Sequence, residues 1–227
     1  MDFKKRLIVG LTAKHGKDWK KKLDEIRKYK IKRFALFLEE IPYKEREKVY
    51  VELLNTKIDE IPLVHIRDDF NEEEILFLKK NFKSKYFTIH ESHFKLLKKW
   101  NGTHKNLYLE MNFDDYVPKN VEINKIGGFC IDLSHFKAAE EKWSKDFLFI
   151  ESKKKIKRYF KCNHINGYSY KKNLDIHTIR GFKDFDYLMT LPEFLFGDVI
   201  ALEMYNSIKD QIEYKKYLEK LLNKKFN

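Results

Sequence analysis

Short apolar runs recur along the chain, and each is followed by a stretch in which apolar residues return every three to four positions. The runs are rich in β-branched and aromatic residues, as in buried strands, whereas the stretches between them have the period of amphipathic helices. After the first run, Trp19, Leu23 and Ile26 fall on one helical face. The pattern predicts strands alternating with helices, with strands at residues 6–11, 33–38, 62–65, 86–90, 106–110, 128–132, 158–164 and 199–203.

Eight strand-helix units predict an α/β fold, a single compact (β/α)8 barrel. Such a barrel can be completed in roughly 200 to 250 residues, and the chain has 227. Only the segment between Glu110 and Gly127 lacks a helical pattern, and it contains Pro118, so we expect an irregular crossover there. No Gly/Ser-rich linker or change of composition interrupts the series, so residues 1–227 are predicted to form one domain.

Side chains that can bind metal stand at the C-terminal edges of six successive predicted strands. In a closed barrel these edges form one ring around the mouth, where the active sites of this architecture are built. A single histidine is more often structural than a ligand, but agreement among six strand ends is much harder to dismiss. The sequence therefore predicts a metal site at the C-terminal face, built from His65, His90, Glu110, Asp132, His164 and Glu203.

Two local motifs add further donors. His135 follows Asp132 by three residues, so the carboxylate and the imidazole can face adjacent metal ions, or one ion and its substrate. Asp175 and His177 form a D-x-H pair in the expected long loop after His164. Either motif alone is a modest signal, because such triplets also arise by chance.

With these residues in place, the chain resembles the endonuclease IV-like apurinic-site endonucleases of the xylose isomerase-like barrel superfamily. Residues 130–139 are similar to the family's sixth-strand motif, through Cys-Ile-Asp, a histidine three positions on and two alanines. Residues 90–93, His-Glu-Ser-His, resemble a shortened form of its fourth-strand histidine motif, and residues 175–179 resemble its D-x-H segment. The resemblance spans nearly the whole chain.

The resemblance implies a site of three zinc ions, with manganese tolerated by the same donors. One ion would be held by His65 and His90, with Glu110 bridging to the second. The second would be held by Asp132, His164 and Glu203, and the third by His135, Asp175 and His177. Glu110 and Glu203 are the expected catalytic residues, the latter because it could also orient the attacking water.

The implied activity is hydrolysis of DNA at abasic sites, by in-line attack at phosphorus of a hydroxide that metal ions generate near neutral pH. Two departures from the family bear on the substrate. The loops that enter the DNA minor groove are shortened here. Residues 66–68, Ile-Arg-Asp, replace the family's small residue, proline and aromatic group, for which Phe70 or Tyr43 could substitute if they are not simply packed.

An excess of basic residues favours a phosphate-rich partner, and DNA is the expected one. The formal net charge is +12 at pH 7. The densest basic run, residues 153–158, precedes a strand and should lie at the opposite end of the barrel from the site. The cations expected near the mouth follow strands instead, and these nucleic-acid-binding candidates are Lys14, Lys17, Arg67, Lys171, Lys172 and Arg180.

Two other classes of function remain open. A sugar or sugar-phosphate isomerase or epimerase of the same superfamily would use one divalent metal, held by the equivalents of Glu110, Asp132, His164 and Glu203, with His135 near the substrate. A non-catalytic nucleic-acid-binding barrel would fit the charge but not the intact ligand set. His65, His90 and the D-x-H pair favour the phosphodiesterase, because a one-metal epimerase has no necessary role for them.

The remaining features indicate a cytoplasmic protein. No signal peptide and no apolar run of membrane-spanning length are found, so no membrane partner is expected. Cys130 and Cys162 are too few for a disulfide framework, and we interpret them mainly as buried small residues. The sequence carries no mark of an oligomeric state.

Overall fold

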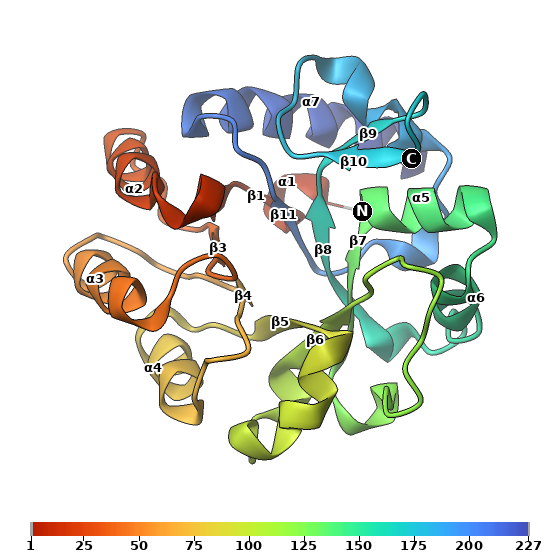
Figure 1. The fold of residues 1–227 in the computed structure, drawn as a ribbon. Helices are drawn as coiled ribbons and strands as arrows, with labels where there is room; N and C mark the ends of the chain where they lie inside the picture. Colours follow the sequence, from red (N-terminus) through yellow and green to blue (C-terminus); the bar gives the residue numbers. More distant parts are fainter. Residues whose placement is uncertain (1, 227) are drawn as a thin grey trace.

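A parallel sheet closes on itself to form the wall of a barrel (Figure 1). The computed structural model describes residues 2–226. The first strand is split at Val9, and its two halves pair with opposite neighbours, β1 with β11 and β2 with β3, which closes the ring. The wall consists of β1 Leu7–Ile8, β2 Gly10–Thr12, β3 Ala35–Phe37, β4 Leu63–His65, β5 Tyr86–His90, β6 Leu107–Glu110, β7 Gly128–Asp132, β8 Phe160–Ile165 and β11 Val199–Leu202.

All eight predicted strands are present, and the predicted (β/α)8 barrel is confirmed. The differences lie at strand ends. The first strand begins at Leu7 because residues 3–6 form a short helix, and the seventh begins at Phe160 because residues 157–159 form a 3-10 turn. Glu203 directly follows the last strand instead of ending it.

Helices surround the sheet on its outer face (Figure 1). The α-helices are α1 Phe3–Arg6, α2 Trp19–Lys28, α3 Tyr43–Leu54, α4 Glu72–Phe82, α5 Leu133–Lys142, α6 Lys145–Glu151 and α7 Ile208–Phe226. The 3-10 helices are η1 Lys14–Gly16, η2 Glu91–Trp100, η3 His104–Asn106, η4 Ile123–Lys125, η5 Lys157–Tyr159, η6 Phe182–Met189 and η7 Glu193–Leu195. The crossover between β6 and β7 contains only η4, as its sequence predicted.

Two apolar clusters form the core. The larger one lies between the sheet and the helices, and it includes Trp19, Leu23 and Ile26 of α2, all buried as their spacing predicted. The smaller one is built from strand residues such as Tyr108 and includes Cys130 and Cys162, the two buried free cysteines. The interpretation of the cysteines as buried small residues is confirmed.

The side chain of Gln211, the chain's only glutamine, bonds to the backbone where the first strand is split. Its Oε1 accepts a hydrogen bond from the Gly10 backbone N–H at 2.8 Å, and its Nε2 donates to the Gly10 carbonyl at 3.0 Å. A Cβ at Gly10 would lie 2.1 Å from the carbonyl oxygen of Leu202, so only glycine fits at this crossing. The fully buried amide thus replaces strand partners where the first strand is split.

The long loop expected after His164 contains a small antiparallel hairpin that the sequence analysis did not predict. Its strands are β9 Gly167–Ser169 and β10 Leu174–Ile176. The hairpin packs against α5 and η6, which holds it at the end of β8 (Figure 1). No helix within residues 2–226 has the length and apolar character required to cross a bilayer.

Candidate metal centre

The period of the strands directs the predicted ligands to one place. Side chains two positions apart along a strand share a face, so Glu110 lies on the same face as Tyr108, and Asp132 on the same face as Cys130. Tyr108 and Cys130 belong to the smaller apolar cluster. The same spacing of two positions separates His65 from Leu63, His164 from Cys162 and Glu203 from Ala201, and these three partners also belong to the smaller cluster. The ligand ring therefore sits directly above this apolar layer, at the C-terminal ends of the strands.

The first group of donors consists of His65, His90 and Glu110, whose ligand atoms all lie within 4.8 Å of one another. Nε2 of His65 lies 3.0 Å from Oε2 of Glu110. The two imidazole rings meet edge to face, with 4.9 Å between centroids. His65 and Glu110 are buried, while His90 is partly exposed toward the mouth.

The central group consists of Glu110, Asp132, His164 and Glu203, again within 4.8 Å. Nδ1 of His164 lies 3.1 Å from Oε2 of Glu110 and 3.2 Å from Oε2 of Glu203. The other ring nitrogen of His164 lies 3.3 Å from Thr88 Oγ1, which fixes the ring orientation. Glu110 belongs to both groups, so it joins them.

The third group combines His135 with Asp175 and His177 of the hairpin segment. Oδ2 of Asp175 lies 2.9 Å from His177 Nε2 and 3.8 Å from His135 Nε2. His135 also links this group to the others, because its Nδ1 lies 3.4 Å from Oε1 of Glu110. The ring of Phe113, from the β6–β7 crossover, covers His135 at 4.0 Å between centroids.

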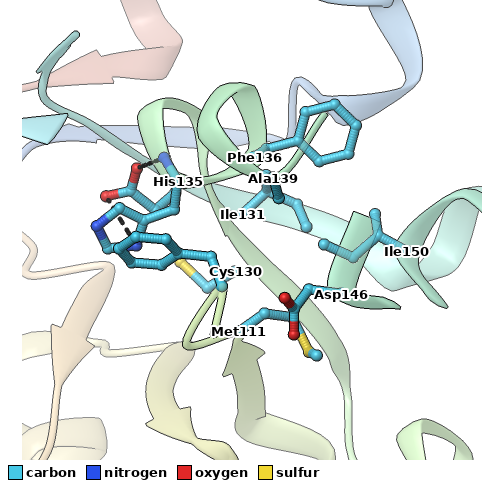
Figure 2. Close-up of a pocket in the computed structure, with 10 residues that line it drawn as sticks. Met111, Cys130, Ile131, His135, Phe136, Ala139, Asp146 and Ile150 are labelled. Carbon is cyan, nitrogen blue, oxygen red and sulfur yellow. Dashed lines mark hydrogen bonds and ion pairs between the residues drawn. The ribbon is translucent and has the colours of Figure 1, made fainter. Parts of the chain in front are cut away.

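Asp132 begins helix α5 and thereby places His135. Its Oδ1 accepts hydrogen bonds from the backbone N–H groups of Ser134 and His135, both at 2.9 Å, as an N-cap does. Its Oδ2 accepts from Asn166 Nδ2 at 2.7 Å. Figure 2 shows His135 on one side of a small space at the end of β7, with Asp146 on the opposite side. That space measures about 10 Å³, room for roughly one water molecule.

Mutual charge interactions shift the pKa values of the buried ligands. Burial alone would lower the pKa of His65, but the carboxylates of Glu39 and Glu110 raise it to about 10. Burial likewise opposes the charged form of His177, yet Asp175 raises its pKa to about 9. Burial would raise the pKa of Glu110, but His164 and the neighbouring imidazoles hold it well below its usual value.

Several of these buried atoms have no hydrogen-bond partner within residues 2–226. They include both ring nitrogens of His65, Nδ1 of His90, His135 and His164, and Oε2 of Glu110. Oxygen and nitrogen donors about 2.1 Å from one tetrahedral zinc ion lie roughly 3.4 Å apart. The separations are 3.0 to 3.2 Å in the first and central groups, and 2.9 and 3.8 Å in the third. The donor set, imidazole and carboxylate, therefore fits zinc or manganese.

Glu39 is a residue of the site that the sequence analysis missed. Its Oε2 lies 3.1 Å from Nδ1 of His65, on the side of the ring opposite Glu110. A carboxylate in this position fixes the tautomer and orientation of a metal-binding histidine. The signal was present in the sequence, because Glu39 directly follows the predicted strand at residues 33–38, and the C-terminal ends of barrel strands carry the active-site residues.

The six predicted basic residues have three different placements. Lys14, Lys172 and Arg180 line a cavity of about 530 Å³ beside the third group. Arg67 instead donates to the Glu39 carbonyl at 3.2 Å and lies 3.3 Å from Asp69. The remaining two, Lys17 and Lys171, are exposed outside that cavity.

The two aromatic residues considered as stacking groups also differ. Phe70 is fully buried beneath the Arg46 guanidinium, 4.2 Å from its ring centroid, so it is a packing residue. Tyr43 is exposed at the start of α3.

The sequence matches no protein-family model and no curated protein. Among solved structures, the chain is similar to one described as a D-tagatose 3-epimerase-like protein, with a TM-score of 0.53 and 14% sequence identity. The match covers 95% of this chain and 97% of that one. The chain has the fold of this barrel. At such low identity the similarity shows a shared fold over almost the full length of the chain. The chemistry depends on the residues of the site.

Proposed function

We propose that this protein is a metal-dependent phosphodiesterase that resembles endonuclease IV and cleaves DNA at abasic sites. The observation that carries the proposal is the arrangement of nine donors in three groups that meet at Glu110. Five of them are in excess of what a single-metal site requires: His65, His90, His135, Asp175 and His177. Burial of additional histidines and carboxylates costs free energy, so their arrangement within ligand distance of one another indicates a function.

The three groups would each hold one zinc or manganese ion, with Glu110 shared between the first and the central group. Such ions, when bound, activate water near neutral pH and offset negative charge on a phosphate and its leaving oxygen. Three adjacent groups would match the needs of phosphodiester hydrolysis, in which a water oxygen attacks phosphorus, an ester oxygen leaves and the phosphate oxygens carry negative charge.

The protein's own residues complete the proposed chemistry. Burial opposes ionisation of Glu203, but His164 lowers its pKa, so this carboxylate is ionised at neutral pH and can orient the attacking water and accept its proton. Burial lowers the pKa of His90, which keeps that imidazole neutral and its ring nitrogen free to bind metal. Phe113 covers His135 and keeps water from one side of the third group.

DNA is the proposed partner on grounds of charge. The net charge of +12 attracts a polyanion, and Lys14, Lys172 and Arg180 stand beside the third group, where phosphates next to the cleaved bond would lie. We also propose that the protein acts in the cytoplasm, as the sequence predicts.

A second candidate function is a sugar or sugar-phosphate isomerase or epimerase that uses one divalent metal. The similar solved structure favours it over the endonuclease, because that protein is described as epimerase-like. The central group would hold the ion, and Glu110 and Glu203 would move protons on the substrate. This function would leave four of the donors without a necessary role: His65, His90, Asp175 and His177.

One assay separates the two candidates. The metal-loaded protein is tested for nicking of a duplex with one abasic site and for epimerisation of ketohexoses and their phosphates. The phosphodiesterase proposal expects nicking by the wild type and its loss in Asp175→Ala and His177→Ala, with His15→Ala, a change of an exposed histidine outside the three groups, as control. Epimerisation without nicking, unaffected by changes at Asp175 and His177, would replace the first candidate by the second.

A further inference from the structure

A cavity of about 530 Å³ opens beside the third donor group. The β9–β10 hairpin and the chain that follows it form most of the lining, and the loop after β2 closes the other side. Asp175 and His177 belong to this lining as well as to the third group, so whatever occupies the cavity lies next to the proposed reaction centre. Its basic lining consists of Lys14, Lys172 and Arg180.

These three cations have no acidic partner within residues 2–226. The ammonium group of Lys14 lies 6.0 Å from the centroid of the Tyr205 ring, and the side chains of Lys172 and Arg180 form no hydrogen bond or ion pair with any described residue. Elsewhere on the molecule many lysines and arginines pair with a carboxylate, as Arg27 does with Glu52 at 2.6 Å. The cations of the cavity are therefore available to a ligand.

The two carboxylates that line the cavity are already engaged by other groups. Oδ2 of Asp184 accepts hydrogen bonds from the backbone N–H groups of Arg180, at 2.9 Å, and Gly181, at 3.3 Å. Oδ2 of Asp175 lies 2.9 Å from His177 Nε2. Neither acid forms an ion pair with the three cations, which outnumber the two acids, so the lining keeps an excess of positive charge.

We propose that this cavity is an anion subsite, which binds a phosphate group of the substrate next to the atoms that react. Arg180 can supply a planar pair of donors to phosphate oxygens, and Lys14 and Lys172 supply point charges. The volume accommodates a phosphate together with the sugar that carries it. The phosphate could belong to a DNA strand or to a sugar phosphate, and the inference rests on the proposed function only in placing the reaction at the barrel mouth.

A pair of double variants with equal loss of charge tests the subsite. Lys172→Ala/Arg180→Ala removes two cations of the cavity, whereas Lys155→Ala/Lys157→Ala removes two exposed lysines that precede β8, at the opposite end of the barrel. All four side chains are exposed, so both variants should fold like the wild type. Thermal unfolding of each confirms that the comparison is made between folded proteins.

Binding is measured with the metal-loaded protein and two probes. One is a fluorescein-labelled duplex with a non-cleavable abasic-site analogue, and the other is ribose 5-phosphate, compared with ribose. For the duplex, we expect the cavity variant to bind roughly 10- to 100-fold more weakly and the control within about twofold. The plot of log affinity against log salt concentration should also become less steep, by about one unit of slope or more, in the cavity variant only.

The outcomes distinguish this inference from the proposed function. Weaker duplex binding by the cavity variant alone supports a subsite for DNA phosphate. Weaker binding of ribose 5-phosphate alone, with ribose unaffected, supports the subsite as one for a sugar phosphate and counts against the phosphodiesterase. Equal losses in the two double variants, or no loss in either, would show that only overall charge matters and would overturn the subsite.

Discussion

Glu110 contacts three histidines through two oxygens. Oε2 lies 3.0 Å from His65 and 3.1 Å from His164, and Oε1 lies 3.4 Å from His135. Each histidine belongs to a different donor group. A single carboxylate thus connects all three groups. Its replacement should reduce metal binding and activity more than the replacement of a residue that belongs to one group only.

The change Glu110→Gln tests this connection. Glutamine preserves the shape of the side chain but removes the charge, so we expect fewer bound metal ions and a loss of activity of roughly a hundredfold or more, with an unchanged circular dichroism spectrum. The matched control is Glu60→Gln, which alters a partly buried carboxylate that pairs with Arg33 at 2.8 Å near the opposite end of the barrel. Turnover equal to that of the wild type would remove Glu110 from the site.

At the scale of elements, the crossover between β6 and β7 is held over the site by two buried acids. Oε2 of Glu91 accepts a hydrogen bond from the backbone N–H of Asn112 at 3.2 Å, and Oδ2 of Asp146 accepts from that of Asp115 at 3.0 Å. Phe113, between these anchors, adopts φ of +51°, an uncommon value for a side chain of this size. The two acids thus hold the aromatic ring over His135.

The anchor at Glu91 predicts a dependence of stability on pH. Burial raises its pKa from 4.5 to about 7, so between these values the unfolded chain releases a proton that the folded protein keeps. The free energy of unfolding should therefore fall as pH rises from 4.5 to 7, by up to about 2 kcal/mol from this group after allowance for solvent screening.

The variant Glu91→Gln should lack this contribution. Urea unfolding of the metal-free protein at pH 5 and pH 8 measures the difference between variant and wild type, and Glu122→Gln, at an exposed position of the crossover, serves as control. An equal change with pH in the wild type and in Glu91→Gln would show that Glu91 is ionised throughout this range.

Strand positions and strand-end ligands could be predicted because both depend on local periods. Asp132 and His164 follow cysteines by two positions, and the pleat of a strand then fixes which face they share. The hairpin at residues 167–176 could not be predicted in the same way, because its strands are only three residues each and neither alternates buried and exposed positions. Its contacts with α5 and η6 are long-range, so the sequence placed Asp175 and His177 near the site only through the family resemblance.

At the scale of the whole molecule, the barrel closes where the two halves of the first strand pair with β11 and β3, and one side chain supports that point. The fully buried Gln211 amide bonds to both backbone groups of Gly10, at the point where the first strand changes its partner from β11 to β3. The eight predicted strands imply a closed barrel, but they do not show which contacts join the first strand to its two neighbours. The fold likewise leaves the substrate open, because barrels of this kind carry many chemistries on similar loops.

Removal of this amide should destabilise the protein. Gln211→Ala leaves a buried N–H and a buried carbonyl without partners, so we expect the free energy of unfolding to fall by about 2 to 4 kcal/mol. Urea unfolding measures it, with Glu213→Ala, an exposed position on the same helix, expected to change it by less than about 0.5 kcal/mol. A loss no larger than that of the control would mean that water or a shifted strand satisfies Gly10.

The number of metal ions bound per chain tests the proposed site most directly. Protein purified without chelators and equilibrated with a slight excess of zinc or manganese is desalted, and its metal and protein contents are determined by mass spectrometry and amino-acid analysis. The three donor groups predict three ions per chain in the wild type and two in His177→Ala. One ion per chain, unchanged in His177→Ala, would contradict the three-ion site and favour the single-metal isomerase.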